Sequence, residues 1–209
     1  MLKKNLLIVT LTLLLTVLLS PTTFATAAAH DHAAMQAMQS DKALPGESLH
    51  RLRVPLVDQQ GKTFRLADEH QAATVITMFY GDCKIACPIA IENVKRTLAA
   101  VPAQQRKQMR VLLISLNPGV DTAASLAKLA ALHELSPGTF RLAVGHDDTQ
   151  TRQLAATLGI KYRRAANGEI NHSTRFLVMD ARGVVIASSD KLSIEPDPVV
   201  VAALTKTLP

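Results

Sequence analysis

The chain has 209 residues, and its 23 Lys and Arg side chains outnumber its 17 Asp and Glu side chains, which gives a formal net charge of +6. The basic residues are scattered and aromatic residues make up only 3% of the sequence, so the composition does not favour a nucleic-acid-binding protein. The two cysteines are too few for a disulfide-stapled scaffold, and beyond the N-terminus no apolar run is long enough to cross a membrane.

Residues 1–27 predict a secretory signal peptide. Lys3 and Lys4 precede an uncharged apolar run at residues 6–19, and small residues follow through Ala29. A charged start, an apolar segment and a small-residue zone are the three parts of such a peptide, and an uncleaved N-terminal anchor is the alternative. Both alternatives place the rest of the chain in the periplasm or at the extracytoplasmic face of the membrane, with membrane contact only through this segment.

Residues 28–48 predict a flexible tether that contains His and Met. The stretch is rich in Ala and Gln and is closed by a Pro-Gly pair. If cleavage follows Ala27, His30 becomes the third residue of the mature chain. A free amine, two amide nitrogens and an imidazole then form a square-planar copper(II) site. His30 is therefore a weaker candidate ligand, and an ordinary flexible N-terminus is the alternative.

Residues 49–209 predict one compact domain that opens with a β-hairpin. Two short runs of alternating apolar residues flank a turn at residues 59–62, and Pro55 indicates that the first of them is an edge strand. Residues 74–80 form a continuous apolar, β-branched run, which predicts a strand buried on both faces. The two cysteines follow this strand directly.

Helices and strands alternate after the cysteines. In chain order we expect a helix at 89–102, a strand at 110–116, a helix at 122–135, a short strand at 139–145, a helix at 147–159, paired strands at 173–180 and 183–189, and a helix at 198–208. Asp121 is expected to cap the second of these helices. Strands joined through a helix should be parallel, whereas the closing hairpin adds antiparallel strands. The predicted fold class is therefore α/β, a thioredoxin-like mixed sheet flanked by helices with an N-terminal β-hairpin.

The stretch FYGDCKIACPIA, residues 79–90, holds both cysteines. Cys83 and Cys87 lie between a buried strand and a helix, and we expect Pro88 at the first helical position because it has no N–H to leave unsatisfied. The unpaired N–H groups of a helix start favour thiolate over thiol. Thiolates bind metal ions and also attack disulfides, so both chemistries are open. A structural disulfide over so short a loop would stabilise the fold only weakly.

The three residues between the cysteines favour a metal site, since thioredoxin-type oxidoreductases usually have two. Soft thiolates select copper(I), with zinc as the usual competitor, and an imidazole would complete a copper(I) site. Among the seven histidines, His172 precedes a strand that should lie beside residues 74–80, so the sheet should bring it to the cysteines. His146, in a helix-start loop, has a weaker case. Copper(II) would need a fourth, harder donor such as Asp82 or water.

Three motifs resemble the SCO/SenC family of copper chaperones. FYGDCKIACPIAIENV is similar to that family's C-x-x-x-C-P loop and helix, VLLISLNPGVDTAASLAKLA to its strand, N/D-P-x-x-D turn and helix, and INHSTRFLVMDARGVVIA to its ligand histidine and β-hairpin. The resemblance runs from about Leu49 to Ser189. The sequence departs from the pattern at Gly81-Asp82, where many members have an aromatic residue or His, and at Asn171, where many have Asp.

The resemblance implies copper binding through Cys83, Cys87 and His172, with Asp121 as the family-matching acid. It implies an extracytoplasmic metallochaperone that delivers copper, as Cu(I) and secondarily Cu(II), to a centre such as the copper A site of cytochrome c oxidase. The expected partners are a copper-receiving protein such as an oxidase subunit and an upstream periplasmic copper donor or thiol reductant. The alternative is a thiol–disulfide oxidoreductase in which Cys83 and Cys87 reduce the recipient's cysteines. Loss of His172 discriminates, because a reductase tolerates it and a copper carrier does not.

Overall fold

The structure is a computed structural model that describes residues 46–207. The chain divides into two units, residues 1–42 and 43–209, and the fold below is that of the second unit. The signal peptide, most of the tether and His30 therefore lie outside the described residues. Within the described part, no helix has both the length and the apolar character needed to span a bilayer.

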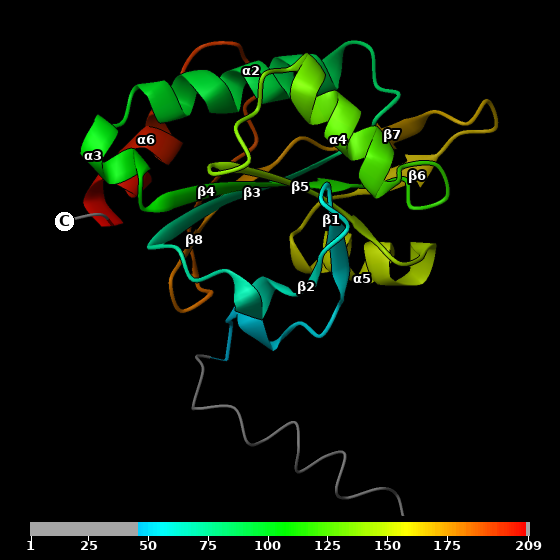
Figure 1. The fold of residues 1–209 in the computed structure, drawn as a ribbon, viewed down its shortest axis with the longest axis horizontal. Coiled ribbons are helices and arrows are strands. Elements are labelled where there is room, and N and C mark those ends of the chain that lie inside the picture. The colour runs from blue at the N-terminus through cyan, green and yellow to red at the C-terminus, as the bar shows by residue number, and fades with distance from the viewer. Residues whose placement is uncertain (1–45, 208–209) are drawn as a thin grey trace, which may run out of the picture. The chain divides into compact units, whose positions relative to one another are not determined.

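A mixed sheet of seven strands forms the centre of the described domain, with the order β2-β1-β5-β4-β3-β8-β9 (Figure 1). The strands are β1 (Leu56–Asp58), β2 (Thr63–Phe64), β3 (Ala73–Phe79), β4 (Met109–Ser115), β5 (Phe140–Gly145), β8 (Phe176–Asp180) and β9 (Val185–Ser189). The neighbours β3, β4 and β5 are parallel, and the other pairs are antiparallel. A separate two-stranded sheet pairs β6 (Tyr162–Arg164) with β7 (Ile170–His172).

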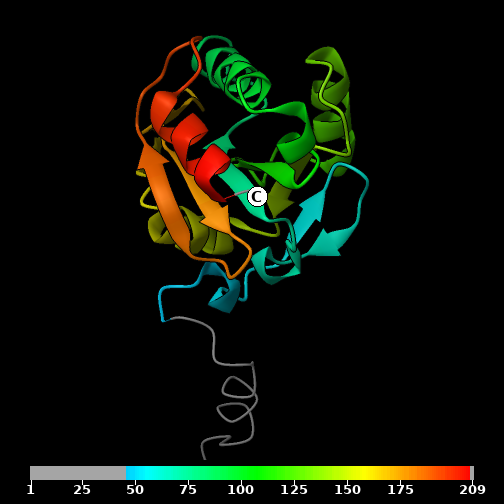
Figure 2. The same ribbon diagram turned by 90° about the vertical axis from the view of Figure 1, so that its left-hand side faces the viewer.

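Helices cover both faces of the central sheet (Figure 1). One face carries α2 (Ala86–Ala99), α4 (Ala123–Leu132) and α6 (Pro198–Thr207), and the other carries α5 (Asp148–Thr157). The short helices are α3 (Ala103–Arg106), η1 (Leu49–Arg51) and η2 (Leu66–Asp68). Figure 2 shows α6 lying against β8 and β9. The predicted mixed sheet, its flanking helices and its N-terminal hairpin are all confirmed.

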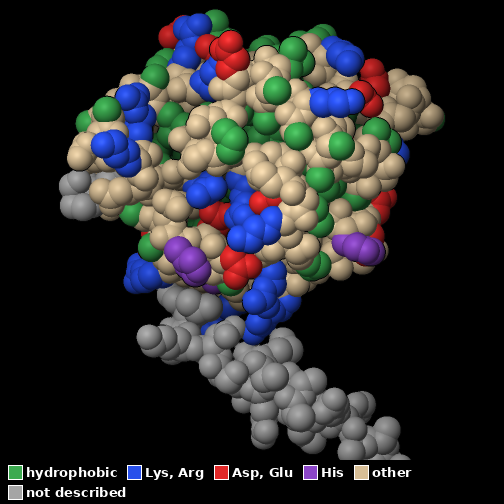
Figure 3. Space-filling model, viewed as in Figure 1, with side chains coloured by type: hydrophobic (Ala, Val, Ile, Leu, Met, Phe, Trp, Pro, Cys, Tyr) green, Lys and Arg blue, Asp and Glu red, His purple; other side chains and the backbone are tan. Residues whose placement is uncertain are grey.

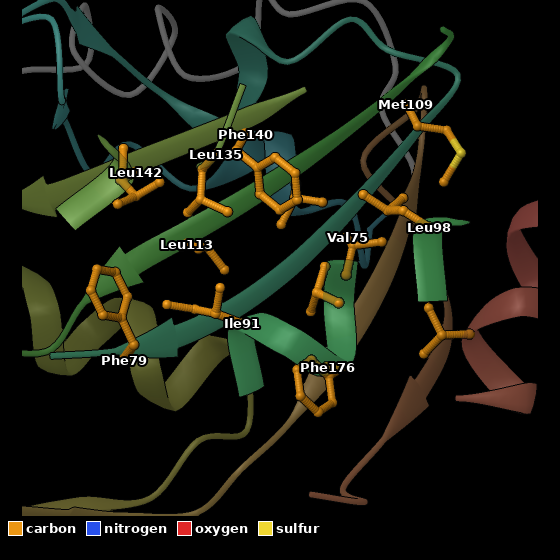
Figure 4. Close-up of a cluster of buried hydrophobic side chains, with 14 of the residues drawn as sticks. Val75, Phe79, Ile91, Leu98, Met109, Leu113, Leu135, Phe140, Leu142 and Phe176 are labelled. Atoms are coloured by element: carbon orange, nitrogen blue, oxygen red, sulfur yellow. The ribbon is translucent and has the colours of Figure 1, made fainter. Parts of the chain in front are cut away.

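The strand that precedes the cysteines is the most deeply buried part of the fold. All seven residues of β3 are buried. Val75 and Phe79 point into the core beneath α2, α4 and α6, where they meet Ile91 and Leu98 of α2 (Figure 4). Ile76 and the other alternate residues of β3 pack on the opposite face. Burial on both faces explains why the run is apolar throughout rather than alternating.

The charged surface agrees with the scattered charges of the sequence. On the face drawn in Figure 3, Lys and Arg side chains lie interspersed with Asp and Glu side chains. A separate, buried ion network lies beneath the surface, in which the Arg141 guanidinium lies 2.9 Å from the Asp58 carboxylate and 2.6 Å from the Glu69 carboxylate. These ion pairs connect the end of β1 and the residue after η2 to β5.

The expectation that Pro55 marks an edge strand is wrong. The strand β1 begins one residue later, at Leu56, and pairs with β2 on one side and β5 on the other. The edge strand is β2. Because Pro55 precedes the ladder, its missing N–H removes no bond between strands.

Two helix starts also differ from expectation. The helix α2 begins at Ala86, so Pro88 is its third residue and not its first. Its missing N–H is still among the first four that have no partner within a helix. The helix α4 is capped by Thr122, whose hydroxyl accepts a hydrogen bond from the Ser125 N–H at 3.2 Å. Asp121, the expected cap, is used elsewhere.

The chain joins the domain at the turn between β8 and β9. The Ser48 hydroxyl donates to the Arg182 carbonyl at 2.6 Å, and the Leu49 N–H donates to the Gly183 carbonyl at 2.8 Å. Gly183 has φ +80°, and a Cβ there would lie 2.6 Å from the His50 ring. Glycine therefore allows the incoming segment to pack directly on the turn.

Candidate metal centre

Three segments that are distant in sequence line one cavity of about 660 Å³. The cysteine loop follows β3, the Asn117–Asp121 turn follows β4, and the β6–β7 hairpin forms the third wall. The two strands are parallel neighbours, so both loops leave the sheet at the same edge. The lining includes Tyr80, Asp82, Cys83, Asn117, Arg164 and His172.

The two sulfurs occupy unlike environments. Cys87 is the second residue of α2, is only 4% exposed and belongs to the core, whereas Cys83 is partly exposed on the cavity wall. The Cys87 N–H donates to the Cys83 sulfur at 3.2 Å. The Cys83 N–H donates to the Tyr80 carbonyl at 3.2 Å, which closes a tight turn. Both cysteines are free thiols, and their side chains are hydrogen-bonded to each other at the start of α2.

The same environments separate the two thiol pKa values. Burial acts to raise the pKa of Cys83, but hydrogen bonds from the Cys87 thiol and from the N–H groups of Cys87, Ile85 and Ala86 outweigh it and lower that pKa. Burial raises the pKa of Cys87 far above its ordinary value, and the hydrogen bond to Cys83 raises it further. Cys83 is therefore the thiol of the pair that ionises more readily, and the hydrogen bonds from Cys87 favour its thiolate form.

Asp121 holds the cysteine loop to the neighbouring turn. Its carboxylate accepts a hydrogen bond from the Gly81 N–H at 3.0 Å and a short one from the Ser115 hydroxyl. Asp121 is 6% exposed, and a Cβ at residue 81 would lie 2.4 Å from its Oδ1. Glycine at this position is therefore required by the close approach of the carboxylate. Asp121 fixes the loop two residues before Cys83.

His172 is the last residue of β7 and is partly buried. Its Nδ1 lies 3.0 Å from the Ser173 carbonyl, which can only accept, so Nδ1 carries the proton and Nε2 keeps its lone pair. Burial lowers the pKa of the imidazole, which keeps the ring neutral. A backbone carbonyl that orients one ring nitrogen while the other is free is the usual arrangement of a metal-binding histidine.

Tyr80 contacts both parts of the site. Its ring meets the His172 ring edge to face, with centroids 6.1 Å apart. Burial raises the pKa of the Tyr80 phenol, and the charge of Cys83 and a side-chain hydrogen bond with it raise that pKa further. The sequence prediction missed this residue, because a tyrosine at the end of a buried strand carries no signal of its own.

The predicted ligands share the site but do not yet enclose an ion. Among residues 46–207, no three His, Cys, Asp or Glu side chains converge closely enough to hold a metal. The two sulfurs are adjacent, His172 lies across the cavity beside Tyr80, and Asp82 is an exposed lining residue. His146 is 79% exposed at the start of α5 and does not line the cavity. Two sulfurs and a free imidazole nitrogen suit copper(I) chemically, but the ligand set stays a prediction.

The sequence was compared with protein-family models and with curated proteins. The SCO1/SenC family model matches residues 47–208. No curated protein sequence matches the chain significantly.

Solved structures give the fold. A SCO1/SenC family lipoprotein from Bacillus anthracis has 18% identity and a TM-score of 0.66, over 73% of this chain and 91% of that chain. Bradyrhizobium japonicum ScoI, solved with copper bound, has 21% identity and a TM-score of 0.60, over 74% and 97%. BsSco, a member of the Sco family of cytochrome c oxidase assembly proteins with a disulfide switch, has 15% identity and a TM-score of 0.62, over 73% and 90%. These similarities confirm the thioredoxin-like fold class.

Proposed function

This chain belongs to the SCO1/SenC family, and from that membership and the geometry of its site we propose that it is an extracytoplasmic copper-binding metallochaperone. It takes copper through Cys83, Cys87 and His172 and delivers it to a copper centre such as the copper A site of cytochrome c oxidase. The observation that carries the proposal is that the Cys83 sulfur, which accepts a hydrogen bond from the Cys87 N–H, lines one cavity together with the His172 imidazole.

The chemistry of this donor set suits transfer as well as binding. Two thiolates and an imidazole give copper(I) three ligands in a trigonal arrangement. Cys83 and His172 line an open cavity, so a thiolate of a recipient can approach the bound ion from that side. Copper then moves by ligand exchange: a bond from the recipient's sulfur forms as a bond to this chain breaks. Neither metal nor protein changes oxidation state in this step.

A second candidate function is thiol–disulfide exchange, which the unequal thiols favour. The Cys83 thiolate would attack a partner's disulfide, which releases one partner sulfur as a thiolate and leaves a mixed disulfide. The Cys87 sulfur would then attack Cys83, which releases the second partner sulfur. The two cysteines lose two electrons in forming their disulfide, and the partner's disulfide gains them. The raised pKa of Cys87 suits the second attacker, which remains a thiol until the mixed disulfide forms.

Copper binding by matched variants tests the proposal. Purified reduced protein should bind one equivalent of Cu(I) under anaerobic conditions, measured by competition with a chromogenic chelator. We expect Cys83→Ser and Cys87→Ser to abolish tight binding and His172→Ala to weaken it by about a hundredfold or more, since losing a ligand should cost no less than losing a residue that orients one. His146→Ala is the control, because His146 is exposed and outside the cavity. Unchanged copper binding by His172→Ala would overturn the ligand assignment.

The same variants separate the two functions. A reductase would keep its rate of disulfide reduction in His172→Ala, whereas a copper carrier would lose transfer to its recipient. Sequencing of the mature N-terminus distinguishes a cleaved signal peptide, in which residues 1–27 are removed, from an uncleaved N-terminal anchor. It also decides whether His30 can contribute a copper(II) site.

A further inference from the structure

A charge-assisted hydrogen bond connects the β6–β7 hairpin to the turn after β4. The Arg164 Nη2 donates to the Asn117 Oδ1 at 2.9 Å. Asp148 lies 3.9 Å from the same guanidinium and is a weaker second partner. Arg164 and Asn117 both line the cavity that holds Cys83 and His172, so their bond crosses from one wall of that cavity to another.

Asn117 is held in place by burial and by backbone hydrogen bonds. It is 5% exposed, its N–H donates to the Ser115 hydroxyl at 2.9 Å, and its carbonyl accepts from the N–H groups of Val120 and Asp121 at 3.0 and 2.8 Å. Asp121 in turn binds Gly81. A continuous path of hydrogen bonds therefore runs from the guanidinium of Arg164 to the loop that carries the cysteines.

The hairpin packs on the rest of the domain through a few residues. Ile170 is buried and Tyr162 packs against the same core, and the Ser173 N–H donates to the Lys161 carbonyl at 2.8 Å. The bonds at its tip stay within the hairpin, as in the Ala165 N–H to the Glu169 carbonyl at 2.7 Å. In the β6–β7 register, Tyr162 faces His172 and Arg164 faces Ile170. Holding Arg164 therefore holds the strand pair that carries His172.

We propose that Arg164 is a positioning residue that, through Asn117, keeps the His172 hairpin at the cavity in the metal-free protein. The inference rests on the proposed copper function, because it concerns how the third ligand reaches the sulfurs. The described residues contain no closed three-ligand group, so at least one side of the site moves when a metal binds, and the hairpin is the side with less buried structure. A hairpin already held at the cavity loses less conformational entropy in that adjustment, and copper is bound more tightly.

Hydrogen exchange of the metal-free protein tests the role of the Arg164–Asn117 hydrogen bond without copper. In Arg164→Ala, we expect the amides of Ala165 and Ser173 to exchange about tenfold faster, because a lost bond to a charged group lowers local stability by that order. Arg163→Ala is the matched control: it removes the same charge from the next position, where the side chain is exposed and does not line the cavity. Unchanged exchange in Arg164→Ala would overturn the proposal.

A double-mutant cycle tests the link to His172. Arg164→Ala should weaken Cu(I) binding by about fivefold, a moderate loss because the side chain is partly exposed. In the His172→Ala background the same change should have no effect, since no ligand is left to position. Arg164→Lys keeps one donor and should recover part of the loss. An equal loss in both backgrounds would mean that Arg164 acts through net charge or fold. If the wild-type protein binds no copper, the proposed function fails. The hydrogen-exchange result still decides whether Arg164 holds the hairpin in place.

Discussion

The two sides of the candidate site differ in how firmly the fold holds them. The cysteine side, residues 81–87, ends in Cys87, a core residue, and is bound at Gly81 by a buried carboxylate. The hairpin side, residues 162–172, is largely exposed, and Ile170 is its one buried residue. The sulfurs are therefore preorganised by the core, whereas the imidazole is carried by a peripheral strand pair that a few contacts keep in place. The proposed function uses both properties, because a metallochaperone must bind an ion and later release it.

The largest effect should follow from breaking the cysteine side at Gly81. In Gly81→Ala the new Cβ would lie 2.4 Å from the Asp121 Oδ1, so the loop must move and a buried carboxylate loses a hydrogen bond. We expect the free energy of unfolding to fall by about 2 kcal/mol. Urea denaturation measures this.

Gly119→Ala is the control for Gly81→Ala. Gly119 lies in the same turn as Asp121, and a Cβ there has no atom within 4 Å. The free energy of unfolding of Gly119→Ala should stay within about 0.5 kcal/mol of the wild-type value. Equal stability of the two variants would show that the cysteine side is not fixed by this contact.

A smaller effect should separate the two thiols. With metal-free reduced protein and iodoacetamide, Cys83 should be alkylated about ten times faster than Cys87 near neutral pH, because it is partly exposed and has the lowered pKa. Mass spectrometry after proteolysis identifies the modified residue. The rate at Cys83 should also reach half its maximum below the pH typical of a free cysteine. Equal rates at both sites would contradict the division of roles between the thiols.

The smallest effect should be an acid response of the hairpin side. Burial lowers the pKa of His172 below 6.5, so in the metal-free protein the unfolded chain binds more protons than the folded chain just below that pH. The free energy of unfolding should therefore decrease as the pH falls through about 6.5 and level off below the folded pKa. His172→Gln should reduce this decrease, and His146→Gln, at an exposed position, should not. Identical pH profiles for the wild type and His172→Gln would show that the imidazole is not held in a desolvated place.

Strong local patterns explain what the sequence could predict. The run at β3, the spacing of apolar residues in α2 and the turn between β8 and β9 each specify one element, and all three are confirmed. The cysteine loop follows β3 as predicted, and β8 lies beside β3, as expected from the position of His172. The ligand roles of Cys83, Cys87 and His172 followed from thiolate and imidazole chemistry together with the family resemblance, and they stay predictions that the copper-binding variants test.

What could not be predicted depends on contacts between distant segments. The β6–β7 hairpin was missed because β6 is rich in arginine and shows no alternation, although Asn167-Gly168 is a turn signal that could have located it. Asp121 was expected to cap α4, but Thr122 has the extended backbone of a cap and pairs with Ser125. Arg164 and Asn117 are 47 positions apart in the sequence, and only the fold brings them into contact. No local pattern encodes such a pairing.

Residues 48 and 49 attach to the turn between β8 and β9, at the end of β3 that lies away from the thiols. Ala73, at the start of β3, pairs with Asp180 beside that turn, and the cysteines follow the other end of the strand. Seven residues of strand separate the two ends, a distance of about 23 Å. Ser48 and Leu49 are not part of the cavity wall, so a change at either end of β3 can be made without altering the contacts at the other.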